Sequence, residues 1–165
     1  MREVFLEKMA KAHGWKRGAE IGVWYGRTFF HLLETVPDLV LYGVDNWQNS
    51  PLIIHHCDQG QNRKDVMERA LFKFPDRGIV LNMTSIEAAR LIPDNQMDFV
   101  FIDADHSYEN VKIDIHQWLP KVKSGGFLTG HDWDWETVRK AVDECIGEVD
   151  PGYPKNDFVW VWRKP

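Results

Sequence analysis

The sequence predicts one α/β domain over residues 1–165, with a doubly wound, mostly parallel sheet and helices on both faces. Three observations predict this fold class. Segments with helical apolar spacing alternate with short strand-like segments along the whole chain. The strand-like segments are nearly continuous apolar runs, which is typical of strands buried on both faces. The chain is also 44% hydrophobic, which suits a single core at this length and leaves no room for a second domain.

The first half of the chain is expected to contain three helices and three strands. Apolar residues recur at helical spacing in the helices, whereas the strands are compact runs rich in Val, Ile and Leu. The helices are expected over residues 2–13, 28–35 and 62–74, and the strands over residues 17–23, 39–45 and 78–83.

The second half repeats this alternation. Pro120 stops the middle helix of this half, and Gly125–Gly126 is expected to open the middle strand. The helices are expected over residues 86–91, 108–118 and 135–146, and the flanking strands over residues 98–103 and 158–162. Because few residues separate the last helix from the final strand, any strand between them must be short.

The junction between the first strand and the next helix indicates a nucleoside-containing ligand. Gly22 and Gly26 let the backbone pass close to a ligand, and the helix that follows offers free N–H groups to an anion. Asp45 closes the second strand, where a carboxylate can accept from ribose hydroxyls. Trp24 and Tyr25 fill the turn where a dinucleotide fingerprint requires small residues. The ligand should therefore lack a pyrophosphate, which disfavours a nicotinamide oxidoreductase.

Charge and composition limit the expected partners. The net charge of -5 argues against a dedicated nucleic-acid surface, which requires an excess of clustered Lys and Arg. Residues 1–8 mix charged and apolar side chains without a continuous apolar core, so neither a signal peptide nor a membrane span is expected. Cys57 and Cys145 match no metal or disulfide spacing. We expect a cytoplasmic protein without nucleic-acid or membrane partners.

Several segments in order resemble the class I S-adenosylmethionine-dependent methyltransferases. The motif E-x-G-x-x-x-G runs from Glu20 to Gly26, and Asp45 is the acidic residue that closes the second strand. Residues 98–108 and 123–132 look like the fourth and fifth strands of that fold, particularly in the subgroup that methylates hydroxyls of sugars and small natural products. The resemblance covers roughly the whole chain. It implies a minimal Rossmann-like methyltransferase fold with a sheet of the seven-stranded type.

The resemblance also implies S-adenosylmethionine as the cofactor. The expected cofactor-binding residues are Glu20, Gly22, Trp24, Gly26, Thr28, Asp45, Trp47, Thr84, Ser85 and Asp103. Some of these residues have a structural alternative. Thr28 could cap a helix instead of holding the methionine carboxylate.

Thr84 and Ser85 have a similar alternative, because they could form a helix N-cap with Glu87 instead of bonding the adenine edge. The rings of Trp24 and Trp47 suit packing on adenine or on the sulfonium, although tryptophan rings more often belong to the core. Asp45 could be a turn acid, but it is expected to bind the ribose, because it follows the glycines at the distance where a ribose carboxylate belongs.

Two routes could activate an acceptor hydroxyl at the ends of the fourth and fifth strands. In the first, Asp103, His131 and Asp132 bind a divalent cation such as Mg²⁺ or Mn²⁺, as the resembling catechol-type enzymes do with two carboxylates and an amide at the matching positions. His131 replaces a carboxylate of that pattern, which favours Mn²⁺, iron or zinc over Mg²⁺. In the second, His106 or His131 takes the proton without a metal. The expected catalytic residues are therefore His106, His131 and Asp103.

The structural alternative for this cluster is that Asp103 and Asp132 serve only the cofactor and the helix caps. The function expected from the sequence is transfer of a methyl group from S-adenosylmethionine to a hydroxyl of a small molecule, such as a sugar or a sugar-bearing metabolite. An amine acceptor is a rival within this class. A non-catalytic S-adenosylmethionine-binding module, or a subunit of a larger assembly, is the alternative from another class.

The connection over residues 46–60 is longer than usual and is expected to contact the substrate, because long loops at the carboxyl ends of parallel strands tend to be lids or binding loops. A homodimer is a further alternative that the sequence leaves open. A partner could cover an open acceptor face in a small chain with eight tryptophans, but an aromatic core would account for these tryptophans equally well.

Overall fold

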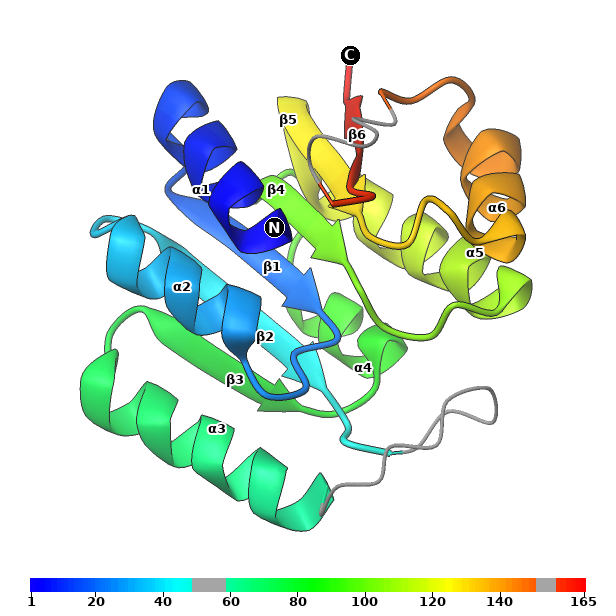
Figure 1. Cartoon of the computed structure of the whole chain (residues 1–165). Helices are drawn as coiled ribbons and strands as arrows, with labels where there is room; N and C mark the ends of the chain where they lie inside the picture. The colour runs from blue at the N-terminus through cyan, green and yellow to red at the C-terminus, as the bar shows by residue number, and fades with distance from the viewer. Residues whose placement is uncertain (49–58, 151–156) are drawn as a thin grey trace.

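The computed structural model describes residues 1–48, 59–150 and 157–165. This part of the chain forms one six-stranded sheet with the order β3-β2-β1-β4-β5-β6 (Figure 1). Strands β1 to β5 are parallel, and β6 runs antiparallel to β5. The strands are β1 (Arg17–Ile21), β2 (Val40–Asp45), β3 (Gly78–Asn82), β4 (Met97–Ile102), β5 (Val122–Gly130) and β6 (Trp160–Arg163). The helices are α1 (Arg2–His13), α2 (Arg27–Thr35), α3 (Gln59–Lys73), α4 (Ser85–Leu91), α5 (Tyr108–Trp118), the 3₁₀ turn η1 (Leu119–Lys121) and α6 (Glu136–Ile146). The expected doubly wound α/β fold is confirmed.

Strand β5 begins earlier than the sequence predicts. It starts at Val122, before the Gly125–Gly126 pair that was expected to open it. A register shift in the pairing of β4 with β5 brings the two backbones close together. A Cβ on Gly126 would lie 2.8 Å from the carbonyl oxygen of Asp98. Glycine is therefore needed inside the strand because the irregular pairing leaves no room for a side chain.

Two apolar clusters lie on opposite faces of the sheet. Helices α1, α2 and α3 pack on one face, and α4, α5 and α6 pack on the other (Figure 1). Successive side chains of β4 point to opposite faces of the sheet, so this strand contributes to both clusters. Phe99 and Phe101 belong to the first cluster, whereas Val100 and Ile102 belong to the second. The strand therefore reads as a continuous apolar run.

The chain order reverses between β1 and β4, which pair directly with each other at the centre of the sheet. Strands β2 and β3 extend the sheet on one side of this point, and β5 and β6 extend it on the other. At such a switch point the connections leave in opposite directions, so a crevice opens outside the carboxyl ends of the strands. Asp45 ends β2 and Asp103 follows β4, so both lie at this crevice.

The segment between α6 and β6 is where a sheet of the seven-stranded type has a further strand. In the described part of this segment, pairing is limited to an isolated antiparallel bridge between Asp150 and Val161. Val161 also pairs with Thr129 of β5, so Asp150 lies on the outer side of β6. This agrees with the expectation that the short connection leaves little length for that strand. Residues 151–156, including the expected turn at Pro151 and Gly152, lie outside the described residues.

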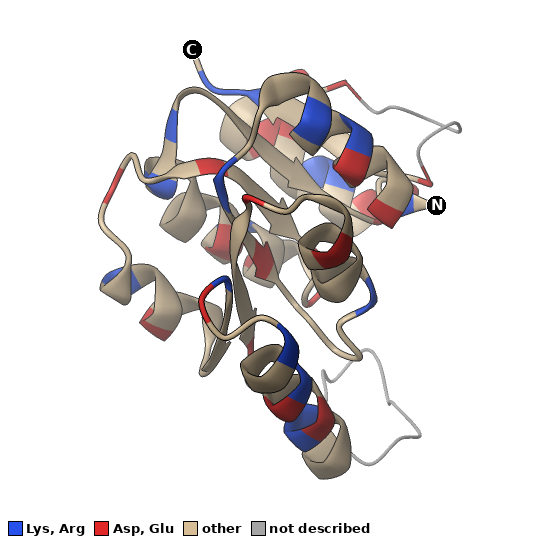
Figure 2. Cartoon of the chain, turned by 90° about the vertical axis from the view of Figure 1, so that its left-hand side faces the viewer, with Lys and Arg blue, Asp and Glu red and all other residues tan. Residues whose placement is uncertain are grey.

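The described surface carries basic and acidic side chains next to one another. Figure 2 shows basic and acidic residues next to one another on the described helices. Along α3, Lys64 lies 3.9 Å from Glu68, and Arg69 lies 2.8 Å from Glu34 of α2. None of the described helices combines the length and apolar character needed to cross a membrane. Residues 49–58, which include Cys57 and most of the connection expected to contact the substrate, lie outside the described residues.

Candidate active site

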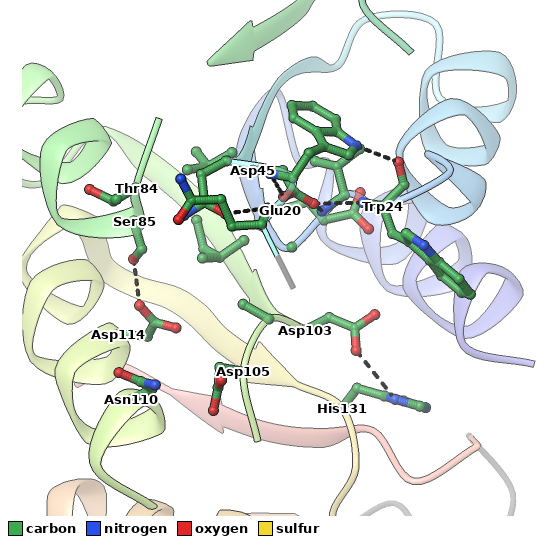
Figure 3. A pocket seen from close by; sticks show the side chains of 18 of the residues that line it. Glu20, Trp24, Asp45, Thr84, Ser85, Asp103, Asp105, Asn110, Asp114 and His131 are labelled. Atoms are coloured by element: carbon green, nitrogen blue, oxygen red, sulfur yellow. Dashed lines mark hydrogen bonds and ion pairs between the residues drawn. The ribbon is translucent and has the colours of Figure 1, made fainter. Parts of the chain in front are cut away.

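A cavity of about 870 Å³ opens at the carboxyl ends of the central strands (Figure 3). Its walls come from the segments that follow β1, β2, β3, β4 and β5, from the N-terminal half of α5, and from Arg2 of α1. Every residue expected from the sequence to bind the cofactor, bind a metal or take part in catalysis lines this cavity, with the exception of Gly26. The tertiary structure therefore brings the expected site residues together.

The turn after β1 is held against the end of β4. Gly22 has a φ of 91°, and a Cβ at this position would lie 2.2 Å from the carbonyl oxygen of Asp103. Gly26 has a φ of 72° and is the N-cap residue of α2, where a Cβ would lie 2.6 Å from the ring of Phe30. Gly22 thus permits a close backbone approach at the cavity, whereas Gly26 shapes the start of the helix.

Asp45 organises the turns around it. Its Oδ2 accepts hydrogen bonds from the backbone nitrogens of Val23 at 2.9 Å and Trp24 at 2.8 Å, and its Oδ1 accepts from the nitrogen of Trp47 at 2.6 Å. A carboxylate has about four lone-pair sites, so these three bonds leave about one site, enough for one of the expected ribose hydroxyls. The role of a turn acid, which was the structural alternative for Asp45, is therefore present.

The two tryptophans beside Asp45 differ in exposure. Trp24 has a φ of 49° and Trp47 a φ of 50°, conformations that their bonds to Asp45 help to hold. Trp24 is 42% exposed and its ring lies 4.5 Å from that of Tyr25. Trp47 is only 6% exposed, packs in the first apolar cluster and donates from Nε1 to the carbonyl oxygen of Trp24. Trp24 is therefore the more open of the two rings for stacking.

The segment after β3 forms a helix cap. Thr84 is the N-cap of α4 in a capping box with Glu87, so the structural alternative for this residue is present. Ser85 instead reaches across to α5, where its Oγ donates to Oδ1 of Asp114 at 2.5 Å and accepts from Nε1 of Trp118 at 2.8 Å (Figure 3). Both Thr84 and Ser85 still line the cavity.

Asp114 is a site residue that the sequence reasoning missed. It is 5% exposed, and burial raises its pKa to about 6, more than its hydrogen bond from Ser85 lowers it. A signal for it exists, because Asp114 falls between Val111 and Ile115 on the apolar face of α5, where a charged residue is unusual. It lines the cavity opposite Asp45 (Figure 3).

Glu20 lies at the floor of the cavity and is 2% exposed. Burial raises its pKa well above the usual value, and the charges of Asp103 and Asp45 raise it further. Its Oε2 has no hydrogen-bond partner among the described residues. A protonated or cationic group of a ligand would satisfy this buried oxygen.

Arg2 completes a cluster of charged groups at the ends of β4 and β5. Nδ1 of His131 lies 3.0 Å from Oδ2 of Asp132 and 3.4 Å from Oδ1 of Asp103. The guanidinium of Arg2 lies 3.2 Å from Oδ2 of Asp103 and 3.3 Å from Nδ1 of His131. Thr28 is buried, and its Oγ1 accepts from Nε of Arg2 at 3.3 Å. The N-cap residue of α2 is Gly26, so Thr28 does not have the capping role that was its structural alternative. No sequence pattern marks Arg2, since only the packing of α1 brings it here.

The two imidazoles of the site flank one carboxylate. Nε2 of His106 lies 2.7 Å from Oδ2 of Asp132, which is close enough for an ion pair. The angles at this contact do not meet those of a hydrogen bond. Burial opposes the charged form of His131, but Asp103 and Asp132 outweigh it and raise the pKa of His131 to about 9. The pKa of His106 is also raised, because Asp132 outweighs burial, and both imidazoles hold the pKa of Asp132 below its usual range despite burial. His131 is therefore charged at neutral pH.

The expected metal ligands lie close enough to share an ion. Asp103, His131 and Asp132 each offer a ligand atom, and these atoms lie within 4.8 Å of one another. Two carboxylates and an imidazole suit Mn²⁺, iron or zinc. However, Arg2 approaches two of the three ligands through Asp103 Oδ2 and His131 Nδ1. The three ligands suit a divalent cation by their chemistry, but the guanidinium cation of Arg2 already contacts two of them.

The fold and the site define a class I S-adenosylmethionine-dependent methyltransferase, with a glycine turn after β1, an acidic residue that ends β2 and a cavity at the switch point of the sheet. The family model described as a methyltransferase domain matches residues 19–133, and the chain belongs to this family. The match spans the glycine turn, Asp45 and the strand-end cluster.

Solved structures with the same fold come from several methyltransferases. A Staphylococcus aureus protein assigned as a caffeoyl-CoA O-methyltransferase has a TM-score of 0.73 and 14% identity, over 99% of this chain and 82% of that chain. The Podospora anserina methyltransferase PaMTH1, bound to S-adenosylhomocysteine, has a TM-score of 0.71 and 14% identity, over 99% of this chain and 77% of that chain. CalS11, a TDP-rhamnose 3'-O-methyltransferase, has a TM-score of 0.66 and 14% identity, over 96% and 76% of the two chains. These similarities show the fold.

A curated relative is much longer than this chain. The Sinorhizobium fredii protein named uncharacterized protein y4gI is 27% identical over 121 residues, which cover 71% of this chain. The match spans only 13% of the length of that relative.

Proposed function

We propose that the protein transfers the methyl group of S-adenosylmethionine to a hydroxyl of a small molecule. The observation that carries this proposal is the pairing of His106 with Asp132 in the wall of the cofactor-sized cavity, next to Asp103 and His131. A domain that only bound a cofactor would not need an imidazole and carboxylate pair beside it. A hydroxyl, by contrast, must lose its proton during methyl transfer.

The cavity offers a contact for each part of the cofactor. Asp45 would accept from a ribose hydroxyl with the lone pair that the three turn amides leave. Ser85 and Asp114 would meet the adenine edge, with Trp24 offering an open ring for stacking. Glu20 would face the amino group of the methionine part, which supplies the partner that its buried Oε2 lacks.

The proton route follows from the placement of His106. When bound, S-adenosylmethionine supplies an electrophilic methyl group on a positively charged sulfur. Nε2 of His106 faces Asp132 and Nδ1 is buried, so the imidazole would have to turn before a ring nitrogen could take the proton of the acceptor hydroxyl. The oxygen then forms the new bond to the methyl carbon, and the electrons of the broken carbon–sulfur bond stay on sulfur. The charge of His131 would stabilise the oxygen as its negative charge develops.

A divalent cation at Asp103, His131 and Asp132 is the second route to the same chemistry. Mg²⁺ or Mn²⁺ there would lower the pKa of the acceptor hydroxyl. The ligand atoms lie within 4.8 Å of one another, which supports this route, and the approach of Arg2 to two of them weighs against it.

The acceptor is proposed to be a small hydroxylated molecule, such as a sugar, with an amine as the rival acceptor. The net charge of -5 and the mixed surface charges favour a small acceptor over nucleic acid or a membrane surface. CalS11 acts on TDP-rhamnose, and a sugar acceptor for this chain would be the same class of substrate. A cytoplasmic location is part of this proposal, and a homodimer stays an open alternative.

A non-catalytic cofactor-binding module is the second candidate function. It is favoured by the length of the y4gI relative, of which this chain matches 13%, since a short domain of this kind can act as one part of a larger protein. Such a module would bind S-adenosylmethionine without turning it over.

The test combines binding and turnover. Calorimetry with S-adenosylhomocysteine would establish the pocket, and mass spectrometry would detect methylated products across a panel of sugars, phenols and amines. We expect His106→Asn to lower kcat by about 100-fold or more while affinity for S-adenosylhomocysteine stays within about twofold. His116→Asn, on the exposed side of α5, is the matched control. Binding without turnover on any acceptor would support the module, and absence of binding would contradict both functions.

A further inference from the structure

Arg2 reaches an unexpected place for the second residue of the chain. It begins α1, yet its guanidinium lies at the carboxyl ends of β4 and β5, where Nη2 lies 3.2 Å from Oδ2 of Asp103. Nη1 lies 3.3 Å from Nδ1 of His131, and Nε donates to Oγ1 of Thr28 at 3.3 Å. Each nitrogen of the guanidinium therefore contacts the wall of the cavity.

The packing of α1 fixes this position. Leu6 and Ala10 are buried in the first apolar cluster, so the helix is anchored to the body of the domain. Glu3 pairs with Arg27 at the start of α2 at 2.8 Å. The backbone nitrogen of Arg2 donates to Oδ2 of Asp157 at 3.2 Å. The side chain of Arg2 is 25% exposed, so most of it is enclosed by its neighbours.

The guanidinium occupies space that a metal ion would need. A divalent cation at this cluster must lie about 2.0–2.3 Å from oxygen and nitrogen ligands. Oδ2 of Asp103 and Nδ1 of His131 both have a guanidinium nitrogen within 3.3 Å. A metal that used these atoms would be placed against a permanent positive charge, because arginine stays protonated in proteins. A metal bound through Asp103 Oδ2 and His131 Nδ1 would therefore compete with the guanidinium.

We infer that Arg2 is the resident cation of this strand-end cluster and takes the place of a divalent metal. Its charge offsets the carboxylates of Asp103 and Asp132, and its planar N–H groups give a fixed direction that a hydrated ion would lack. Arg2 is thus a positioning residue, which holds Asp103 in place without contacting the reacting atoms. The inference goes beyond the proposed function, since it concerns the occupant of the cluster and does not depend on methyl transfer.

The test measures Mn²⁺ binding to the full chain without cofactor or acceptor, by the electron paramagnetic resonance signal of free Mn²⁺. A purification tag is kept at the carboxyl terminus so that Arg2 is undisturbed. We expect the wild type to leave Mn²⁺ free up to about 1 mM, and Arg2→Met to bind it at least about tenfold more tightly, a change of about 1.4 kcal/mol. Adding Asp103→Asn to Arg2→Met should abolish that gain.

Two further variants test whether a gain of Mn²⁺ binding comes from removing the cation at the cluster or from any loss of positive charge near the cavity. Arg27→Met removes a cation that also lines the cavity but pairs with Glu3 outside the cluster, so it should behave as the wild type. Arg2→Lys keeps a positive charge in place and should also fail to bind Mn²⁺. Thermal melting of each variant establishes that it is folded.

Several outcomes would overturn the inference. Mn²⁺ binding by the wild type at micromolar concentration that Asp103→Asn removes would show that Arg2 does not hold the site. Failure of a folded Arg2→Met to gain Mn²⁺ binding would show that the three ligands form no latent cation site. Should Arg2→Met not fold, a wild-type crystal soaked in Mn²⁺ decides, because an anomalous peak beside Asp103 overturns the inference and a guanidinium in that place supports it. None of these results depends on finding an acceptor, so failure of the proposed function would be recognised separately by the binding and turnover assays.

Discussion

The carboxylate of Asp45 lies 2.8 Å from the backbone nitrogen of Trp24, so the acid that ends β2 fastens the glycine turn that follows β1. The same side chain also accepts from Val23 and Trp47. A residue expected to bind the ribose therefore also builds the wall on which the ribose would lie. Its two roles can be separated by the choice of substitution.

Asp45→Asn keeps one acceptor oxygen and the shape of the side chain, whereas Asp45→Ala removes all three bonds to the turn. We expect Asp45→Asn to weaken binding of S-adenosylhomocysteine by about tenfold, as for loss of a charge-assisted hydrogen bond. Asp45→Ala should reduce it below detection. Calorimetry measures both. Asp38→Ala serves as the control, because Asp38 forms an exposed pair with Lys16 near the amino ends of β1 and β2. Equal losses for Asn and Ala would contradict a separate role in the turn.

Gly22→Ala tests the close approach of β1 and β4. We expect the free energy of unfolding to fall by about 2–5 kcal/mol, from about 1–2 for a side chain at positive φ and about 1–3 for displacement of the backbone of Asp103. Gly14→Ala is the matched control, because Gly14 has a φ of 63° but a Cβ there meets nothing within 4 Å. Urea denaturation gives both values. If the two substitutions cost the same, the contact with Asp103 is not limiting.

Asp114 predicts a pH dependence of stability. Its pKa is raised from 3.8 to about 6 in the folded protein. Between these values the folded state holds a proton that the unfolded state has released, so the free energy of unfolding falls as pH rises. Relative to Asp114→Asn, the wild type should lose up to about 3 kcal/mol of stability between pH 4 and pH 7. Urea denaturation at several pH values measures this, and parallel curves for the two proteins would refute the assignment.

Arg77 stabilises the end of α2. Its guanidinium donates to the carbonyl oxygens of Leu33 at 2.9 Å, Val36 at 3.2 Å and Leu39 at 3.3 Å. These include carbonyls that a helix end leaves without partners, so Arg77→Met should lower the free energy of unfolding by about 2–3 kcal/mol. Lys11→Met removes an exposed pair with Glu7 and should change stability by less than about 0.5 kcal/mol. Similar losses in chemical denaturation would contradict the role of Arg77.

Much of the fold could be predicted from local pattern. Helices α1 and α5 have the bounds that their apolar spacing predicts, because that spacing also decides which face packs on the sheet. The start of β5 could not be predicted, because Gly126 is required by a backbone on another strand. The carboxyl ends of parallel strands meet at one edge, so residues at those ends were rightly expected to share a cavity.

The sequence by itself determined the doubly wound α/β class, the family and the group of residues at the strand ends, because these depend on periodicity and on motifs local to each strand. Only the tertiary structure decided how those residues are used. It shows that Asp45 accepts hydrogen bonds from the turn after β1, that Ser85 donates to Asp114, and that Arg2 forms an ion pair with Asp103. The physical reason is that hydrogen bonds and ion pairs between distant elements depend on how the helices pack. The local sequence around a charged residue at the start of a helix does not show which distant residue will pair with it.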